Sequence, residues 1–265
     1  MKKLEIYCVT NKKIKFLEQS PYKLAAVGLE IFSNRYLKCN KKINIFYKQK
    51  NYSELTFHYW YWKNIMNLKS KNWVGFCQRR RFWIKKTSEK EKINKDNLKY
   101  HMLISPEPDW SFYDSIICEP IKVSGAKKIK ILKRGWRNVL ANPRMLFSEK
   151  NQNIKLHFDM HHGFGNLDLA IEQLNLEDKY DFSNFVKSNS QFNPHIMFIS
   201  KSYILDKWFT TLFTWLERCE KKISHNQLIG YDTTRIYAYL AERFLSYWFQ
   251  KYTKYKTHPW VFIDH

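Results

Sequence analysis

The stretch "NWVGFCQRRRFW" (residues 72–83) joins an apolar run directly to three consecutive arginines. Residues 73–77 are apolar or small throughout, which is typical of a strand that is buried on both faces of a parallel sheet. Arg79, Arg80 and Arg81 then stand at the carboxyl end of that strand. Three adjacent guanidinium groups call for negative charge opposite them, either from the protein or from a bound anion.

Strand-like and helix-like segments alternate outward from this stretch. We expect strands at 4–11, 43–49, 73–77, 114–123, 153–163 and 195–200, and helices at 21–35, 51–67, 165–174, 180–189, 201–222 and 233–252. This alternation predicts an α/β fold with a mostly parallel central sheet flanked by helices, followed by an all-helical C-terminal section. We expect residues 1–200 to form the core and residues 201–265 to pack on it within one structural unit.

The carboxyl ends of the strands are where such sheets bind ligands. Besides the three arginines, the end of the first strand brings Thr10 and Asn11 to this edge. The helix at 51–67 follows a polar segment in which Ser53 is the expected N-cap. The sequence therefore predicts a binding site at the strand ends.

The chain carries a large excess of positive charge. Its 265 residues include 46 Lys and Arg against 24 Asp and Glu, a formal net charge of +22. Such a charge suits nucleic acid, an anionic membrane surface, or a substrate with phosphate groups. Alternatively, lysines scattered over solvent-exposed faces, with no specific partner, would give the same net charge. The hydrophobic content of 44% is enough for a large buried core and excludes a disordered chain.

The cysteines and the missing motifs narrow the class of protein. Five cysteines, an odd number, form no CxxC pair, and no signal peptide is apparent, so we expect reduced thiols and a cytoplasmic protein. No apolar stretch reaches the roughly 18 residues that cross a bilayer, which leaves a peripheral position on the inner face of the membrane open. The chain has no GxGxxG, Walker-type or G-x-S-x-G motif, which argues against dinucleotide, ATP and esterase-type chemistry.

Several segments, in chain order, resemble one protein family. They are "IYCVTNK" (6–12), "NYSELTFHYWYWKN" (51–64), "WVGFCQRRRFW" (73–83), "YDSIICEP" (113–120), "HHGFGNLDLAIEQL" (161–174), "FNPHIMFISKSYILDKW" (192–208) and "RIYAYLAERFLSYWF" (235–249). The set resembles the bacterial domain of unknown function 4422. That family is found with capsule and exopolysaccharide biosynthesis and is regarded as glycosyltransferases of the GT-A type.

The resemblance implies a GT-A-like, Rossmann-type fold and a glycosyltransferase. Such an enzyme would move a sugar from a nucleotide diphosphate sugar, with a UDP-sugar as the first expectation, to a lipid-linked or growing glycan acceptor in surface polysaccharide synthesis. Three positions depart from the family pattern. The family's His and Tyr after the cysteine are Gln78 and Arg79 here, and its His after "VT" is Asn11. These departures indicate a branch with a different substrate, or a member that kept the fold and lost activity.

GT-A enzymes typically hold the donor diphosphate through a divalent metal bound by an Asp-x-Asp at a strand end. No apolar strand of this sequence ends that way, and the nearest segment, Glu107–Asp109, is loop-like. Guanidinium groups bind phosphate bidentately and stay charged. We therefore expect Arg80 and Arg81, assisted by Arg79, to neutralise the leaving diphosphate. We assign no metal ligand, and leave Mn²⁺ or Mg²⁺ open as a cofactor. Surface ion pairing of the arginines is the alternative.

The helix at 51–67 supports a binding and a structural interpretation. Sugars need polar groups beside aromatic faces, so its polar residues would join those at the strand ends as donor-binding residues: Thr10, Asn11, Glu54, Thr56, Lys63 and Gln78. The aromatic residues of the same helix, Tyr59, Trp60 and Trp62, are expected to belong to the core.

The segment "FDMHHGFGNLDLAIEQ" (158–173) supplies candidate proton acceptors. Inverting transfer needs a base for the acceptor hydroxyl, and we assign Asp168 and His162 to this role, with His161 and Asn193 as acceptor-binding residues. Asp168 could instead stabilise a helix N-terminus. Because adjacent residues of a strand point to opposite faces, we do not expect His161 and His162 to chelate one metal ion together.

Two further alternatives remain at this stage. On the last helix, Arg235, Glu242 and Arg243 could form internal ion pairs or contact donor phosphate. The runner-up function is nucleic-acid binding, because basic charge is interleaved with aromatic residues. The aromatic residues mostly follow helical core spacing and no nucleic-acid recognition motif is present, so we expect no nucleic-acid partner.

Overall fold

The computed structural model describes residues 3–223, 228 and 230–264. The chain divides into two compact units. The first comprises residues 1–119, 194–210 and 248–265, and the second residues 120–193 and 211–247. These boundaries differ from the expected division at residue 200, because the chain leaves the first unit after residue 119 and returns to it at residue 194.

The first unit contains a nine-stranded sheet within the described residues. Seven strands follow the order β10-β6-β9-β4-β1-β2-β3, and the two others form a β5–β11 pair attached to β4. The strands are β1 (Leu4–Thr10), β2 (Lys23–Ala26), β3 (Leu37–Lys38), β4 (Trp73–Gln78), β5 (Arg81–Trp83), β6 (Ser115–Cys118), β9 (Phe198–Lys201), β10 (Tyr255–His258) and β11 (Trp260–Phe262). The helices are α1 (Gln49–Tyr52), α2 (Leu55–Asn64) and α3 (Leu98–His101), with short 3-10 turns at Lys15–Leu17, Phe46–Lys48, Lys86–Ser88 and Pro108–Phe112.

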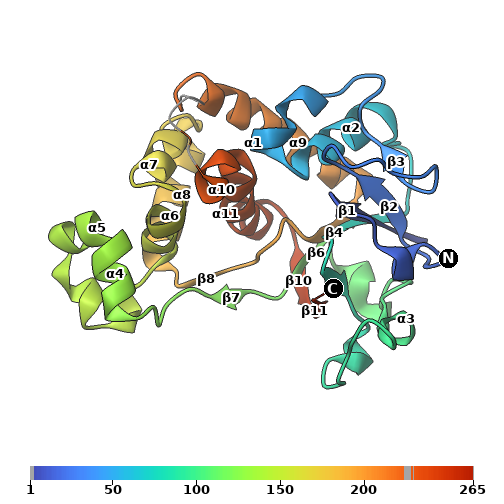
Figure 1. Ribbon diagram of the computed structural model, residues 1–265, viewed down its shortest axis with the longest axis horizontal. Helices are drawn as coiled ribbons and strands as arrows, with labels where there is room; N and C mark the ends of the chain where they lie inside the picture. The colour runs from blue at the N-terminus through green and yellow to red at the C-terminus, as the bar shows by residue number, and fades with distance from the viewer. Residues whose placement is uncertain (1–2, 224–227, 229, 265) are drawn as a thin grey trace. The chain divides into compact units, whose positions relative to one another are not determined.

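The sheet is mostly parallel, as expected. The pairs β1–β2, β1–β4, β2–β3 and β6–β10 are parallel, whereas β9 runs antiparallel to both of its neighbours, β4 and β6. β1 and β4 are neighbours in the middle of the sheet, where β1 also pairs with β2 and β4 with β9 (Figure 1). The expected strands at 4–11 and 73–77 and the helix at 51–67 are confirmed.

Both faces of the central strands are covered, and alternate residues explain how. Tyr7 of β1 contacts Phe57 and Tyr61 of α2, with ring centroids 5.7 and 5.0 Å apart. Its neighbours Ile6 and Cys8 point to the other face and belong to a large apolar cluster. Because apolar residues are needed on both sides, the strand reads as one continuous apolar run.

Two early expectations are wrong. The segment 21–35 does not form a helix: Lys23–Ala26 is β2, which pairs with β1 from Tyr7 to Thr10. The later apolar residues of that segment, Leu29 and Ile31, are exposed, so the apparent helical spacing does not mark a buried face. The expected strand at 43–49 is instead a 3-10 turn that leads into α1.

The second unit is mainly helical. It contains α4 (Lys128–Arg134), α5 (Trp136–Ala141), α6 (Ile154–His162), α7 (Asn166–Ile171), α8 (Leu176–Ser188) and α10 (Tyr231–Thr234), 3-10 turns at Pro143–Leu146 and Glu149–Asn151, and a small sheet of β7 (Ile121–Lys122) and β8 (Gln191–Phe192). Two long helices, α9 (Ser202–Glu220) and α11 (Ile236–Tyr252), contribute residues to both units.

The segment 153–163 is a helix, α6, and not the strand that we expected. The Asn153 side chain caps it by accepting from the Leu156 backbone N–H at 2.9 Å. Ile154, Phe158 and His162, spaced by four residues, are buried. This spacing is helical, and the aromatic and histidine content of the segment hid it.

The expected C-terminal helices are confirmed as α9, α10 and α11, but the section is not all-helical, because β10 and β11 return to the sheet of the first unit. All five cysteines are buried free thiols. In the part of the chain that the structure describes, no helix is long and apolar enough to cross a membrane.

Candidate functional site

The carboxyl ends of β1 and β4 meet at a topological switch point. From β1 the chain continues to β2 and β3 on one side, and it returns as β4 on the other side of β1. In open α/β sheets the crevice outside such a pair of strand ends is the usual ligand site. Thr10 ends β1 there and is followed by Asn11, and Gln78 ends β4 and is followed by Arg79. The Arg79 backbone N–H donates to the Val9 carbonyl at 3.0 Å, which ties the two strand ends together.

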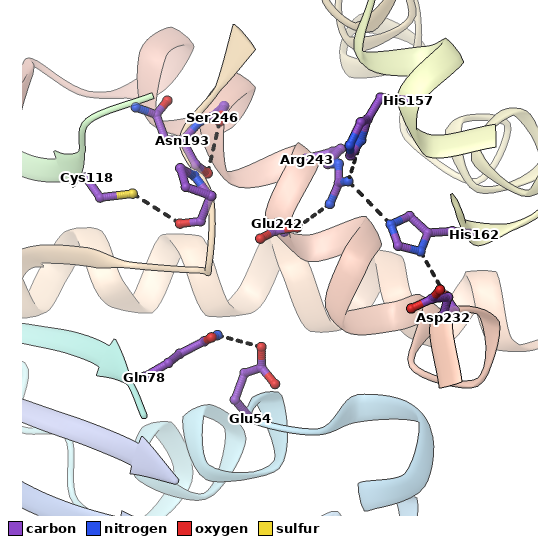
Figure 2. Close-up of polar contacts among 11 residues, drawn as sticks. Glu54, Gln78, Cys118, His157, His162, Asn193, Asp232, Glu242, Arg243 and Ser246 are labelled. Carbon is purple, nitrogen blue, oxygen red and sulfur yellow. Dashed lines mark hydrogen bonds and ion pairs between the residues drawn. The ribbon is translucent and has the colours of Figure 1, made fainter. Parts of the chain in front are cut away.

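Gln78 is held by a buried carboxylate. Its Nε2 donates to Glu54 Oε1 at 2.6 Å (Figure 2). Glu54 occupies the N-cap position of α2, one residue after the expected cap Ser53, and only 8% of its surface is exposed. The structure therefore brings together two predicted donor-binding residues from separate segments. The contact also explains why Gln78, in place of the family's His, is compatible with the fold.

Arg79 and Arg80 form the tight turn between β4 and β5, and Arg81 is the first residue of β5; we call residues 79–81 the arginine turn. Arg80 adopts φ 77°, a left-handed conformation that the turn requires. Its carbonyl accepts from the Ile263 backbone N–H at 2.8 Å, and its guanidinium pairs with Asp264. The Phe262 ring lies under the guanidiniums of Arg80 and Arg81, at 4.8 and 5.3 Å from ring centroid to Cζ.

The arginines are thus neither buried nor free in solvent. All three are half-buried, and within the described residues the buried Nε of Arg80 has no hydrogen-bond partner. The contact with the Phe262 ring restricts the positions of these two guanidiniums, each of which carries several N–H donors. Such preorganised donors suit an anion with several oxygens.

The other predicted donor residues differ in position. Thr10 is buried, and its hydroxyl donates to the Lys12 carbonyl at 2.5 Å, so it shapes the turn after β1, whereas Asn11 is exposed. Thr56 is fully buried and donates to the Ser53 carbonyl at 2.8 Å. Lys63 lies near the far end of α2 with its Nζ 3.2 Å from the centroid of the Trp62 ring.

Two residues near the C-terminus belong to this site and were not predicted from the sequence. Phe262 and Asp264 contact the arginines, but we assigned their segment to a helical section. The continuous apolar run "WVFI" (260–263), rich in aromatic and β-branched residues, is the signal that could have predicted a strand after Pro259.

In the second unit the predicted base His162 belongs to a buried network around Arg243. The Nη2 of Arg243 lies 3.2 Å from His157 Nδ1 and 3.4 Å from His162 Nε2, and its Nη1 pairs with Glu242 (Figure 2). His162 Nδ1 lies 2.8 Å from the Asp232 carbonyl oxygen. Because a carbonyl only accepts, Nδ1 carries the proton and Nε2 accepts from Arg243.

This network depresses the basicity of its histidines. Burial and the charge of Arg243 lower the pKa of His162 to about 3, and the same causes lower the pKa of His157 to about 2. Both nitrogens of His162 are engaged and its ring stacks on Tyr239 at 3.8 Å. Its assignment as a base stays a prediction that these contacts do not favour. The internal ion pair that we considered for Glu242 and Arg243 is present.

Asp168 lies in the first turn of α7 and is half-exposed. Its carboxylate accepts from Lys155 Nζ at 2.5 Å, and Lys155 also contacts the buried Asp159 at 3.0 Å. Burial raises the pKa of Asp159. Asp168 therefore meets the requirements of a helix-terminus residue and keeps an accessible carboxylate.

The two predicted acceptor residues have different environments. His161 lines two cavities of the second unit, of about 240 and about 400 Å³. Asn193 is buried, and its backbone N–H donates to Ser246 Oγ at 2.7 Å. Among the described residues no group of three or more His, Cys, Asp or Glu is placed to hold a metal ion. In the Glu107–Asp109 segment, Asp109 pairs with Lys256.

The fold defines an α/β protein whose sheet carries three half-buried arginines at its switch point. Within that class, the chain belongs to the family described as "Domain of unknown function (DUF4422)", whose model matches residues 5–254. No curated protein matches the sequence.

Among solved structures, the fold is similar to that of WbbM, described as a bifunctional glycosyltransferase in its apo form. The TM-score is 0.70 and the sequence identity 21%, over 99% of this chain and 45% of the other. The chain therefore spans less than half the length of that protein. At this identity the match shows a shared α/β fold.

Proposed function

We propose that this protein is a glycosyltransferase. Its donor would be a nucleotide diphosphate sugar, with a UDP-sugar as the first candidate. Its acceptor would be a lipid-linked or growing glycan in surface polysaccharide synthesis. The observation that carries the proposal is the half-buried arginine turn, residues 79–81, at the switch point of the sheet. The fold similarity to a glycosyltransferase and the membership of the DUF4422 family support it.

The arginine turn would bind the diphosphate of the donor. Arg80 and Arg81 are oriented by the Phe262 ring, and the adjacent Gln78 is fixed by Glu54. Groups held in this way lose little freedom on binding, so they can stabilise charge at a defined point. Asn11, at the neighbouring strand end, would add a polar contact to the nucleotide or the sugar.

In the proposed reaction the acceptor hydroxyl oxygen bonds to the anomeric carbon of the sugar. The bond from that carbon to the phosphate oxygen breaks, and its electron pair leaves with the nucleoside diphosphate, which gains negative charge. The guanidiniums would stabilise this charge as it develops. The hydroxyl proton passes to a base. Of the two residues assigned to this role from the sequence, Asp168 keeps an accessible carboxylate, whereas His162 has a pKa of about 3.

The experiment is a titration of the protein with UDP-sugars by isothermal calorimetry, together with an assay of nucleoside diphosphate release. We expect Arg79→Gln, Arg80→Gln and Arg81→Gln each to weaken donor binding by about tenfold, since a charge-assisted contact contributes about 1.5–3 kcal/mol. Arg35→Gln is the matched control, because Arg35 also forms an ion pair, with Glu18, but lies elsewhere in the first unit.

The triple variant gives the decisive result. If donor affinity and turnover of the folded triple variant equal those of the wild type, the arginine turn is not the diphosphate site and the proposal is withdrawn. Asp264→Asn provides a second check. It frees Arg80 from its ion pair, and we expect unchanged or tighter donor binding, since Asp264 competes with the diphosphate for the guanidinium.

A further inference from the structure

The segment 127–147, which includes α4 and α5, combines charge and apolar surface in an unusual way. It contains seven Lys and Arg residues and no Asp or Glu. It also exposes five large apolar side chains: Ile129, Leu132, Trp136, Leu140 and Phe147. We call the surface formed by these residues the basic apolar face.

The packing of α4 and α5 explains why the apolar residues point outward. Ile131, Gly135 and Asn138, spaced four and three apart, are buried. A Cβ at Gly135 would lie 3.0 Å from both Leu156 Cδ1 and Met160 Cγ of α6, so the backbone is in close contact with that helix. The inward side is therefore occupied, and Ile129, Leu132, Trp136 and Leu140 lie on the outward side by the same helical periodicity.

The apolar side chains of this face are more exposed than is usual for a protein surface. Ile129, Leu140 and Phe147 are 80%, 73% and 78% exposed, and Leu132 and Trp136 are each half exposed. Single exposed apolar residues need no explanation, but a group of this kind marks an interaction site. Among the described residues, none of the seven cations of the segment forms an ion pair with a carboxylate.

The chemistry of the face distinguishes between partners. A nucleic-acid surface would rely on stacking rings, whereas three of the five apolar residues here are aliphatic. A protein interface would be poor in lysine at its centre. Lysines that surround Trp, Phe, Leu and Ile are typical of a segment that lies in the interface of an anionic bilayer, where the apolar side chains enter the boundary and the cations contact lipid phosphates.

We propose that the basic apolar face binds the surface of an anionic phospholipid bilayer. The exposed apolar residues supply insertion, and the seven cations supply attraction to the phosphate groups. The proposal stands independently of the donor site and of the glycosyltransferase reaction, because it rests on residues of the second unit that the donor site does not use.

The test is co-sedimentation of the whole protein with vesicles of phosphatidylglycerol and phosphatidylcholine in equal parts, compared with vesicles of phosphatidylcholine alone. We expect binding to the mixed vesicles at least about tenfold stronger than to the neutral ones, and weaker binding as salt rises. The triple variant Lys128→Glu/Lys130→Glu/Lys133→Glu and the triple variant Ile129→Ser/Leu140→Ser/Phe147→Ser should each lower binding by about tenfold or more.

Matched controls are available in the first unit. Lys90→Glu/Lys92→Glu/Lys95→Glu makes the same change in net charge on an exposed loop, and Leu29→Ser/Ile31→Ser/Ile43→Ser removes three other exposed apolar residues. Both controls should bind the mixed vesicles as the wild type does. Because all the substituted side chains are exposed, the circular dichroism spectrum of every variant should be unchanged.

Several results would overturn the proposal. Equal binding to neutral vesicles, or no binding to either kind, removes the anionic bilayer as the partner. If the face variants bind as the wild type does, the surface is elsewhere. If those variants lose retention on single-stranded DNA but not on vesicles, the face binds nucleic acid instead. If they change only the oligomeric state in light scattering, the face is an interface between copies of this chain.

Discussion

Arg243 shows how a single residue can organise a unit. Its guanidinium is buried, contacts His157 and His162, and lies 4.3 Å from the centroid of the Phe192 ring. A planar group with several donors can serve these neighbours at once, which an ammonium cannot do. From the sequence we considered an internal ion pair or a contact with donor phosphate for this residue, but its histidine partners on α6 could not be located before the fold was known.

Replacement of Arg243 should be strongly destabilising. We expect Arg243→Met to lower the free energy of unfolding by about 3–5 kcal/mol, since it removes one partner of a buried ion pair with Glu242. Arg243→Lys should cost less, because it keeps the charge but not the geometry. Urea denaturation followed by circular dichroism measures both, with the exposed Arg218→Met as the control. A midpoint for Arg243→Met equal to that of the control would contradict this account.

At the level of elements, the pattern of apolar residues predicted the central strands correctly, but it gave the wrong type of secondary structure for α6 and β2. β1 and β4 are buried on both faces and were predicted with nearly correct ends. The helix α6 was mistaken for a strand, although the spacing of Ile154, Phe158 and His162 is helical. β2 was mistaken for a helix because pairing with β1, a long-range event, decides its conformation.

Gly75 in the middle of β4 shows how closely neighbouring strands and their side chains pack. A Cβ there would lie 2.6 Å from Ile199 Cγ1, on the paired strand β9, and 3.3 Å from Ile6 Cγ1. We expect Gly75→Ala to lower the free energy of unfolding by about 1–3 kcal/mol through overpacking.

A double-mutant cycle isolates this contact. In the background of Ile199→Ala, where the obstructing Cγ1 is absent, the additional cost of Gly75→Ala should fall by about 1 kcal/mol or more. The measurement is the urea midpoint of the four proteins of the cycle. Strict additivity of the two single changes would show that the steric contact is not the cause.

For the whole molecule, the sequence predicted the fold class and placed the arginines at the strand ends. It did not predict which residues contact those arginines. The arginines and the residues that follow β1 were placed at the strand ends because parallel sheets collect ligands there. The Gln78–Glu54 contact follows from the start of α2 next to that edge. Phe262 and Asp264 could not be predicted, because they reach the arginines only after the chain has passed through the second unit and returned.

The buried histidines predict that the whole protein is acid-labile. His58, His162 and His258 are buried, and desolvation lowers their pKa values to about 4, 3 and 4. A histidine whose pKa is depressed in the folded state stays neutral there, while the unfolded chain binds a proton below about pH 6.5. The stability that each contributes is therefore present above that pH and is lost as the pH falls toward the folded-state value.

Between about pH 7.5 and pH 5.5 each of these histidines should lower the free energy of unfolding by about 1.3 kcal/mol, or about 4 kcal/mol together. Urea denaturation at both pH values measures the change. His58→Phe tests one contribution: the ring of His58 lies among Phe76, Phe198 and Phe209, so a phenyl group fits the chemistry of the site. This variant should lose about 1.3 kcal/mol less than the wild type over the same range. If the wild-type midpoint does not move between the two pH values, these histidines are not the acid-sensitive groups of the fold.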